Sequence, residues 1–172
     1  RKRSAFYRLV RHSRFAPDTT LKAFAPDRPT LTVLVPATIQ AVSDHPDWAT
    51  ADLSSLKAVS TGSQVVPPHL IERIVARGVP VLQVYGSTET CPIAIYTRLG
   101  CETDRHETTG LAGLFCDAMV VDDAGREVPP DVAGEIGVRG PNVFSEYWRN
   151  EDATRDAFSD GWYRTGDVGH LD

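Results

Sequence analysis

The stretch that most constrains this chain is residues 83–90, which read Gln-Val-Tyr-Gly-Ser-Thr-Glu-Thr. It follows a short apolar run, residues 79–82, which is typical of a buried strand. A strand that ends in an aromatic ring, a glycine, hydroxyls and a carboxylate places polar groups at the carboxyl edge of a sheet. In open α/β sheets that edge is where ligands bind. The stretch taken alone is equally typical of a strand followed by an ordinary polar turn.

The side chains of this stretch suit a nucleotide and its metal ion. Tyr85 offers a flat face for a base, and Gly86 lets the backbone approach a ligand closely. Thr88 offers a hydroxyl to a phosphate oxygen, and Glu89 offers the hard oxygen ligand that Mg²⁺ prefers. These side chains would therefore suit phosphate and metal binding, with the ordinary polar turn as an equal alternative.

The charge of the chain is unevenly distributed. The 172 residues carry a net charge of -5, but residues 1–28 carry +6 and the remainder carries -11. General nucleic-acid binding needs a basic face, which the acidic remainder does not supply. We therefore expect no nucleic-acid partner. The basic residues 1–14 have apolar residues at helical spacing, which predicts a surface helix packed on a larger domain.

The cysteines and the apolar runs indicate the cellular compartment in which the protein is expected. Cys91, Cys101 and Cys116 form no C-x-x-C pair and leave an odd thiol, which suits a reducing environment better than disulfides or a zinc site. No run approaches 18 apolar residues, and the basic start lacks the apolar core of a signal peptide. We expect a cytoplasmic protein without a transmembrane segment.

Periodicity and turn residues predict a series of alternating elements. Helices are expected at residues 19–24, with Asp18 as cap and Pro26 as a breaker, and at 36–43, 67–77 and 150–158. Strands are expected at residues 31–35, 56–60, 79–85, 93–96, 119–122, 134–138 and 161–164. Trp48, in the loop at 44–54, is expected to pack over the sheet rather than contact a ligand.

Short strand–helix–strand connections predict the topology of the first part. They imply parallel strands with a right-handed crossover, so that successive strands end at the same edge. We therefore expect the turn at residues 62–64 to face Tyr85 and Gly86 across one crevice. The predicted fold class is α/β, with a parallel-sheet α/β subdomain at residues 1–108 followed by a small β-barrel-like segment at 109–172.

Three motifs resemble one family. Residues 85–89, Tyr-Gly-Ser-Thr-Glu, look like the Y-G-x-T-E core of the adenylate-forming superfamily of acyl-CoA synthetases, luciferases and adenylation domains. Residues 134–140 resemble its G-E-I-x-V-R-G motif, and residues 163–167 resemble its Y-R-T-G-D motif. All three occur in the family's order, and the resemblance covers the chain from about Thr30 onward.

The resemblance implies an enzyme that activates a carboxylic acid with ATP and Mg²⁺ as an acyl-adenylate. The resemblance implies that Thr88 and Glu89 are catalytic, with Glu89 as the metal ligand. It also implies that the adenine is framed by Gly62, Ser63, Gln64 and Tyr85. Asp167 would hold the ribose, while Gly86 and Ser87 would border the carboxylate and the acyl tail. The resemblance implies mainly structural roles for Glu135 and Arg139.

Three functions stay open at this point. The first is part of an acyl-CoA synthetase, a fatty-acid–CoA ligase that transfers the acyl group to coenzyme A. It is favoured because residues 30–172 look most like medium- or long-chain acyl-CoA synthetases. The second is an adenylation module that loads a carrier protein. The third is a non-enzymatic nucleotide-binding or interaction domain that uses the basic residues 1–28.

Two parts of the family's machinery have no match in this sequence. One is the phosphate loop with its lysine, and the other is the catalytic lysine near the family's C-terminus. The lysines of the chain are Lys2, Lys22 and Lys57, all before the Tyr85 motif. We therefore expect a middle segment of the family's large domain, inactive on its own.

Overall fold

The computed structural model describes residues 8–100 and 106–172 and divides the chain into two compact units. The first unit is Arg1–Leu82 and the second is Gln83–Asp172, so the boundary falls inside one strand, β3 (Val81–Tyr85). Each unit is described by itself. The subdomain division expected at residues 108 and 109 stays a prediction.

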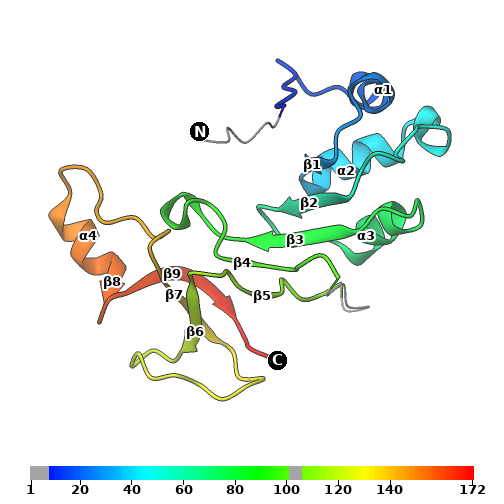
Figure 1. The fold of residues 1–172 in the computed structure, drawn as a ribbon. Coiled ribbons are helices and arrows are strands. Elements are labelled where there is room, and N and C mark those ends of the chain that lie inside the picture. The colour runs from blue at the N-terminus through cyan, green and yellow to red at the C-terminus, as the bar shows by residue number, and fades with distance from the viewer. Residues whose placement is uncertain (1–7, 101–105) are drawn as a thin grey trace, which may run out of the picture. The chain divides into compact units, whose positions relative to one another are not determined.

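The first unit alternates helices and strands (Figure 1). Strand β1 pairs in parallel with β2, and the Val59 amide donates to Pro80 O at 2.9 Å, beside the start of β3. The elements are α1 (Pro17–Asp27), β1 (Leu31–Val33), α2 (Pro36–Ser43), the 3₁₀ helix η1 (Pro46–Ala49), β2 (Ala58–Gly62) and α3 (Pro68–Val75).

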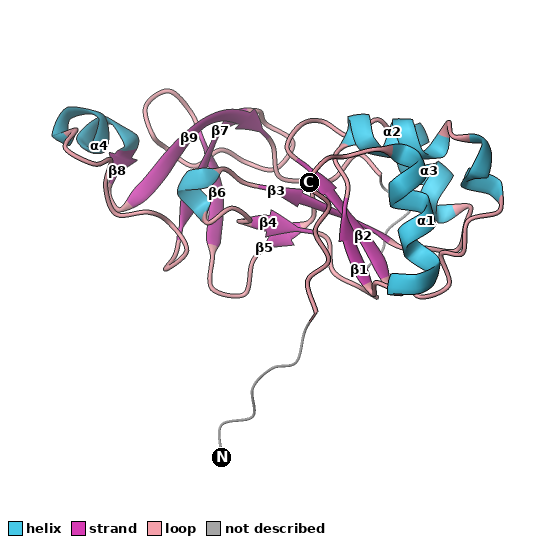
Figure 2. Ribbon diagram, turned by 90° about the horizontal axis from the view of Figure 1, so that it is seen from above, coloured by secondary structure: helices cyan, strands magenta, loops and turns pink. Residues whose placement is uncertain are grey.

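The core of this unit combines the apolar faces of its helices with apolar side chains of strands and loops. In Figures 1 and 2 the three helices lie together beside β1 and β2. Each contributes buried side chains: Leu21 and Phe24 from α1, Ile39 and Val42 from α2, and Leu70, Ile71 and Ile74 from α3. Trp48 packs against this core, as expected, and the Arg77 guanidinium lies 5.2 Å from the centre of its ring.

Helix α1 differs from the prediction at both ends. It begins at Pro17, with Ala16 in the cap position, so Asp18 lies in the first turn and is not the cap. It also continues through Pro26 to Asp27. Pro26 cannot donate the i→i−4 hydrogen bond, and the chain leaves the helix two residues later, at Arg28, with a left-handed φ of 44°.

The helix expected over residues 1–14 is wrong for the residues that the structure describes. Residues 8–14 form no helix, and residues 1–7 lie outside the described chain. Leu9, one residue of the expected apolar stripe, is 76% exposed and therefore does not pack into a core.

Strand β2 lies two residues later than predicted. The Leu56 amide closes a turn onto Leu53 O, and the Lys57 amide donates to Thr30 O, so the strand begins at Ala58. Gly62, expected in the following turn, is therefore the buried last residue of the strand. The turn itself falls at Ser63, whose φ is 71°.

The second unit is built mainly from antiparallel strands. The end of β3 pairs with β4 (Ile95–Tyr96), which pairs with β5 (Leu111–Ala112). A four-stranded antiparallel sheet follows in the order β6-β7-β9-β8. Its strands are β6 (Asp117–Val121), β7 (Gly134–Arg139), β8 (Phe158–Ser159) and β9 (Trp162–Gly169).

Helix α4 (Glu151–Ala157) precedes β8 and is capped by Asn150, whose Oδ1 accepts from the Ala153 amide at 3.2 Å, as predicted. The core of the unit contains Val138 and Tyr163, with Phe144 and Phe158 packed against them. The parallel α/β part and the barrel-like antiparallel sheet confirm the predicted fold class.

Among the described helices, none has both the length and the apolar character that a membrane crossing requires.

Candidate functional site

Tyr85 and Asp167 meet, although 82 positions separate them in the sequence. Tyr85 is the last residue of β3, and its hydroxyl donates to Asp167 Oδ2 at 2.7 Å. Partial burial raises the pKa of Tyr85, and the Asp167 carboxylate raises it further, while the Thr165 hydroxyl acts in the opposite direction. The tyrosine therefore stays protonated and donates to the carboxylate at neutral pH.

Asp167 lies in an irregularity of β9. Opposite β7, Arg164 pairs with Gly137 and Val168 pairs with Glu135, so three residues of β9 face the single residue Ile136. The three residues, 165–167, bulge out of the ladder, with Gly166 in a left-handed conformation at φ 75°. This differs from the prediction, in which the strand ended at residue 164. The bulge is what presents Asp167, an exposed side chain, away from the sheet.

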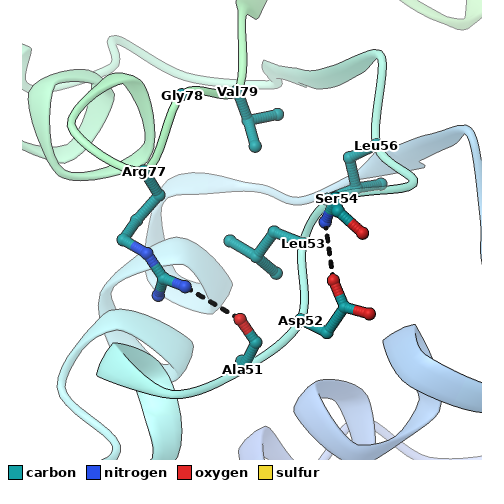
Figure 3. Close-up of a pocket in the computed structure, with 8 residues that line it drawn as sticks. All are labelled: Ala51, Asp52, Leu53, Ser54, Leu56, Arg77, Gly78 and Val79. Carbon is teal, nitrogen blue, oxygen red and sulfur yellow. Dashed lines mark hydrogen bonds between the residues drawn. The ribbon is translucent and has the colours of Figure 1, made fainter.

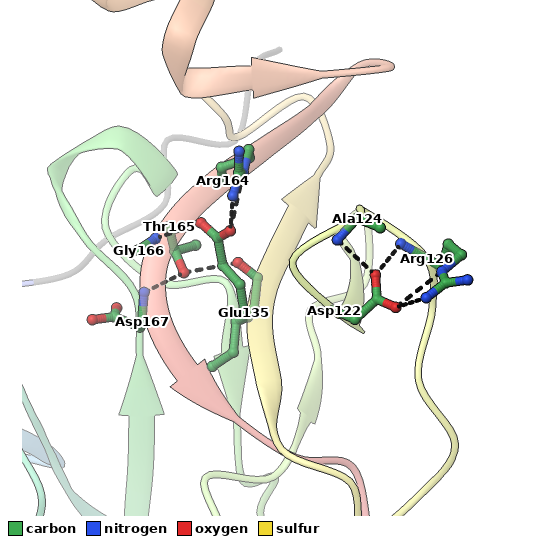
Figure 4. Close-up of polar contacts among 9 residues, drawn as sticks. Asp122, Ala124, Arg126, Glu135, Arg164, Thr165, Gly166 and Asp167 are labelled. Atoms are coloured by element: carbon green, nitrogen blue, oxygen red, sulfur yellow. Dashed lines mark hydrogen bonds and ion pairs between the residues drawn. The ribbon is translucent and has the colours of Figure 1, made fainter.

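Local hydrogen bonds fix the shape of this bulge (Figure 4). The Thr165 hydroxyl donates to Ile136 O at 2.8 Å, and the same oxygen accepts from the Asp167 amide at 3.1 Å. Thr165 thereby replaces ladder bonds that the bulge removes.

Gly86 permits a close approach that another residue would block. Its φ is +156°, and a Cβ added there would lie 1.9 Å from Pro92 O and 2.6 Å from Thr90 Oγ1. The chain folds back at this point, because the Ala94 amide donates to Tyr85 O at 2.9 Å. Glycine is thus required by the fold of the loop itself, in addition to the ligand approach expected from the sequence.

The loop after Gly86 forms the short 3₁₀ helix η2 (Thr88–Thr90). Thr90, fully buried, closes it: its Oγ1 accepts from the Ser87 amide at 2.9 Å and lies 3.1 Å from Ser87 O and from Pro92 O. Thr88 is exposed and Glu89 is half-buried. The loop therefore presents Thr88 and Glu89 from a rigid base.

Glu89 is held by a segment that the sequence analysis did not assign to the site. Tyr147 OH donates to Glu89 Oε1 at 3.1 Å, and the Phe144 amide donates to Glu89 O at 2.8 Å. Asn142 Nδ2 donates to Thr90 O at 3.0 Å. The aromatic residues Phe144 and Tyr147, in an otherwise polar loop, were the sequence signal for this segment. In the structure the centres of their two rings lie 4.6 Å apart.

The carboxylate of Glu89 is ionised and accessible. Its own backbone amide, then the Ser87 hydroxyl and Tyr147, lower its pKa. Among the residues that the structure describes, no group of three His, Cys, Asp or Glu side chains converges as a metal cluster. A single carboxylate with phosphate oxygens and water is a common Mg²⁺ environment, so the donor chemistry of Glu89 fits the ion expected there.

Gly62, Ser63 and Gln64 belong to the first unit. Gly62 is buried, while Ser63 and Gln64 are exposed beyond the end of β2. Their contribution to the adenine site stays a prediction.

The first unit contains a hollow of about 290 Å³ that includes none of the predicted site residues (Figure 3). The guanidinium of Arg77, which lines the hollow, already donates two hydrogen bonds to backbone oxygens. Arg77 Nη2 donates to Ala51 O at 2.8 Å, and Arg77 Nη1 donates to Trp48 O. Asp52 accepts from the Ser54 amide at 3.0 Å. The lining residues are Ala51, Asp52, Leu53, Ser54, Leu56, Arg77, Gly78 and Val79.

Replacing Tyr147 by phenylalanine tests the contact with Glu89. Burial, and then the Glu89 carboxylate, raise the pKa of Tyr147 from 10.0 to about 12. A raised pKa in the folded state stabilises the fold below pH 10, and this contribution is lost as the pH rises from 10 to about 12. At pH 8 the variant should lose about 1 kcal/mol of unfolding free energy, through the missing hydrogen bond.

Urea unfolding at pH 8 and pH 11 measures this effect. The difference between the wild-type protein and Tyr147→Phe should shrink at the higher pH. An equal difference at both pH values would show that the phenol does not interact with Glu89.

Comparison with known proteins gives the family. The model of the AMP-binding enzyme family matches residues 5–148. The chain is 46% identical over 169 residues to an indoleacetate–CoA ligase of Aromatoleum aromaticum, covering 98% of this chain and 33% of the relative. It is 35% identical over 162 residues to a medium/long-chain-fatty-acid–CoA ligase of Mycobacterium tuberculosis, covering 93% of this chain and 28% of the relative.

A solved structure agrees with this assignment. The anthranilate CoA ligase AuaEII, in complex with anthranoyl-AMP, superposes with a TM-score of 0.84 at 27% identity, over 91% of this chain and 30% of that one. The chain thus spans about a third of the length of these relatives. The motifs, the fold and these matches together show that the chain belongs to the AMP-binding enzymes of the adenylate-forming superfamily.

Proposed function

We propose that this chain is the nucleotide-binding part of an ATP-dependent acid–CoA ligase. The observation that carries the proposal is the contact between Tyr85 and Asp167, a flat aromatic ring beside an exposed carboxylate. A carboxylate accepts hydrogen bonds from the two hydroxyls of a ribose, and the ring offers a face to the base. The similarity to a protein solved with anthranoyl-AMP supports the same assignment.

In this proposal Asp167 holds the ribose, and Tyr85 offers its ring to the adenine. Thr88 donates to a phosphate oxygen, while Gly86 and Ser87 border the substrate carboxylate. Mg²⁺, when bound by Glu89, would offset phosphate charge as two anions approach each other. A carboxylate oxygen of the substrate then bonds to the α-phosphorus, the bond to pyrophosphate breaks, and an acyl-adenylate remains. The sulfur of a thiol, which loses its proton, next forms a bond to the acyl carbon, and the bond from that carbon to AMP breaks.

The substrate class is part of the proposal. The sequence alone favours a fatty acid, and the similarity to a fatty-acid–CoA ligase supports that choice. The higher identity to an indoleacetate–CoA ligase favours an aryl-substituted acid. We therefore place an aryl-substituted acid first and a fatty acid second, with coenzyme A as the acceptor and the cytoplasm as the site of action.

Pyrophosphate exchange tests the activity. The intact protein that carries these 172 residues should exchange label between pyrophosphate and ATP when given an acid of the right class. The isolated segment lacks the family's two lysines and should be slower by at least about a thousandfold, since each lost charge-stabilising group costs a factor of hundreds. Exchange by the segment at the intact rate would contradict the assignment as a part of the enzyme.

The identity of the molecule that accepts the acyl group is tested on the same protein. Product analysis with indoleacetate and with a medium-chain fatty acid, each offered coenzyme A or a phosphopantetheine-bearing carrier protein, separates the alternatives. Formation of the thioester with coenzyme A alone supports the proposal. Loading of the carrier alone would replace coenzyme A as the acceptor.

A further inference from the structure

The bulge that presents Asp167 leaves a backbone donor without its ladder partner. Because three residues of β9 face one residue of β7, the amide of Gly166 has no carbonyl opposite it. It points instead at a side chain of β7, where it donates to Glu135 Oε1 at 3.0 Å (Figure 4). A side chain thus replaces the missing backbone acceptor, one residue before Asp167.

The second oxygen of Glu135 is used as well. Glu135 Oε2 accepts from Arg164 Nε at 3.0 Å and from Arg164 Nη2 at 2.5 Å. Arg164 is the last regularly paired residue before the bulge. The same carboxylate therefore holds both the residue that enters the bulge and the glycine at its apex. The Glu135 side chain is only 20% exposed, which limits its alternatives.

These contacts require a carboxylate. All three groups that face Glu135 are donors, and an ionised carboxylate is acceptor-only on both oxygens. A glutamine of the same shape would have to turn its amide nitrogen toward either Gly166 or Arg164. One of the two contacts would then become donor against donor.

We propose that Glu135 is a positioning residue that fixes Asp167 for the ribose hydroxyls of the nucleotide, so its role goes beyond scaffold. The Asp167 amide donates to Thr165 Oγ1, and its carboxylate accepts from Tyr85, so both contacts involve the bulge or its neighbour β3. The direction of the carboxylate therefore depends on the bulge, and the bulge depends on Glu135. The inference rests on the proposed nucleotide site.

The chain offers a matched control in a neighbouring turn. Asp122 accepts from the Ala124 amide at 2.9 Å, from the Arg126 amide at 3.0 Å and from the Arg126 guanidinium at 2.8 Å (Figure 4). It is again a carboxylate that joins backbone amides to an arginine, but it orders the turn that follows β6. Asp122→Asn thus removes the same chemistry away from Asp167.

The test compares two ligands on the intact protein. Isothermal titration gives the affinities for AMP and for 2′,3′-dideoxy-AMP, which lacks both ribose hydroxyls. The wild-type protein should prefer AMP. In Glu135→Gln the affinity for AMP should fall about tenfold, and the affinity for the dideoxy ligand should change by less than about twofold. In Asp122→Asn both affinities should stay within about twofold of wild type.

A second variant covers the case in which Glu135→Gln does not fold. Arg164→Lys keeps the charge but loses the planar fork that grips Glu135, and its side chain is 49% exposed, so the fold should tolerate it. It should lose part of the preference for AMP, in the same direction. Thermal unfolding of every variant separates lost stability from lost discrimination.

The outcomes separate the inference from the function on which it rests. If the wild-type protein does not distinguish AMP from the dideoxy ligand, the ribose site fails and the role of Glu135 fails with it. If the wild-type protein and Arg164→Lys discriminate equally, and a folded Glu135→Gln does too, only the role of Glu135 is overturned. A loss of discrimination in both variants, with Asp122→Asn unchanged, supports it.

Discussion

Replacing Asp167 by alanine is expected to weaken AMP binding more than about a hundredfold. In the proposed site its carboxylate accepts from two ribose hydroxyls, and hydrogen bonds to a charged group contribute about 1.5–3 kcal/mol each. The stability of the fold should change little, because Asp167 is exposed and its loss leaves only the Tyr85 hydroxyl without its partner. Isothermal titration with AMP, together with thermal unfolding, measures both effects on the intact protein.

The control for Asp167→Ala is Asp123→Ala. Asp123 is also an exposed aspartate of the second unit, but it lies in the turn after β6. The two variants carry the same change of net charge, so an effect of net charge alone would appear in both. Equal AMP affinities in Asp167→Ala and Asp123→Ala would remove Asp167 from the site and leave the nucleotide assignment without its central contact.

Gly86→Ala should be the most destabilising substitution in the loop that carries Thr88 and Glu89. The added methyl group would lie 1.9 Å from Pro92 O, a backbone atom that can move only if the return of the chain toward β4 moves. Steric strain of this kind, added to an unfavourable φ of +156°, should cost about 3 kcal/mol or more. Urea unfolding measures the loss, and AMP binding should weaken with it because Tyr85 precedes the displaced loop.

Gly125→Ala separates the cost of the steric clash from the cost of the positive φ. Gly125 also has a positive φ, +76°, but an added Cβ there meets nothing within 4 Å. Only the backbone strain remains, which should cost about 1 kcal/mol. A Gly86→Ala variant no less stable than Gly125→Ala would show that the loop relaxes around the methyl group, and that the close approach to Pro92 is not needed for the fold.

Local patterns predicted the helices well where apolar spacing and proline agreed. Pro36 begins α2 and Asn150 caps α4, because both effects depend on a few neighbouring residues. The end of α1 was missed because a proline weakens a helix without fixing the residue at which it ends, and α1 runs one residue past Pro26. The start of β2 was missed because the Lys57 amide bonds to Thr30 O, a contact that no local pattern contains.

The candidate site was predicted only in part, for the same physical reason. The resemblance to the family identified Tyr85 and Asp167, and the structure brings the two together. It did not reveal the residues that support them. Tyr147 reaches Glu89 across 58 positions and Asn142 reaches Thr90 across 52, so these contacts exist only once the second unit has folded.

The double hold on Glu89 has a consequence for the strength of ligand binding. Phe144 fixes its backbone and Tyr147 fixes its carboxylate through contacts made within the protein itself. The conformational entropy of this side chain is therefore lost when the chain folds and need not be lost again on association. If Glu89 takes the metal-binding role proposed for it, this preorganisation would lower the entropic cost of binding Mg²⁺ together with the nucleotide.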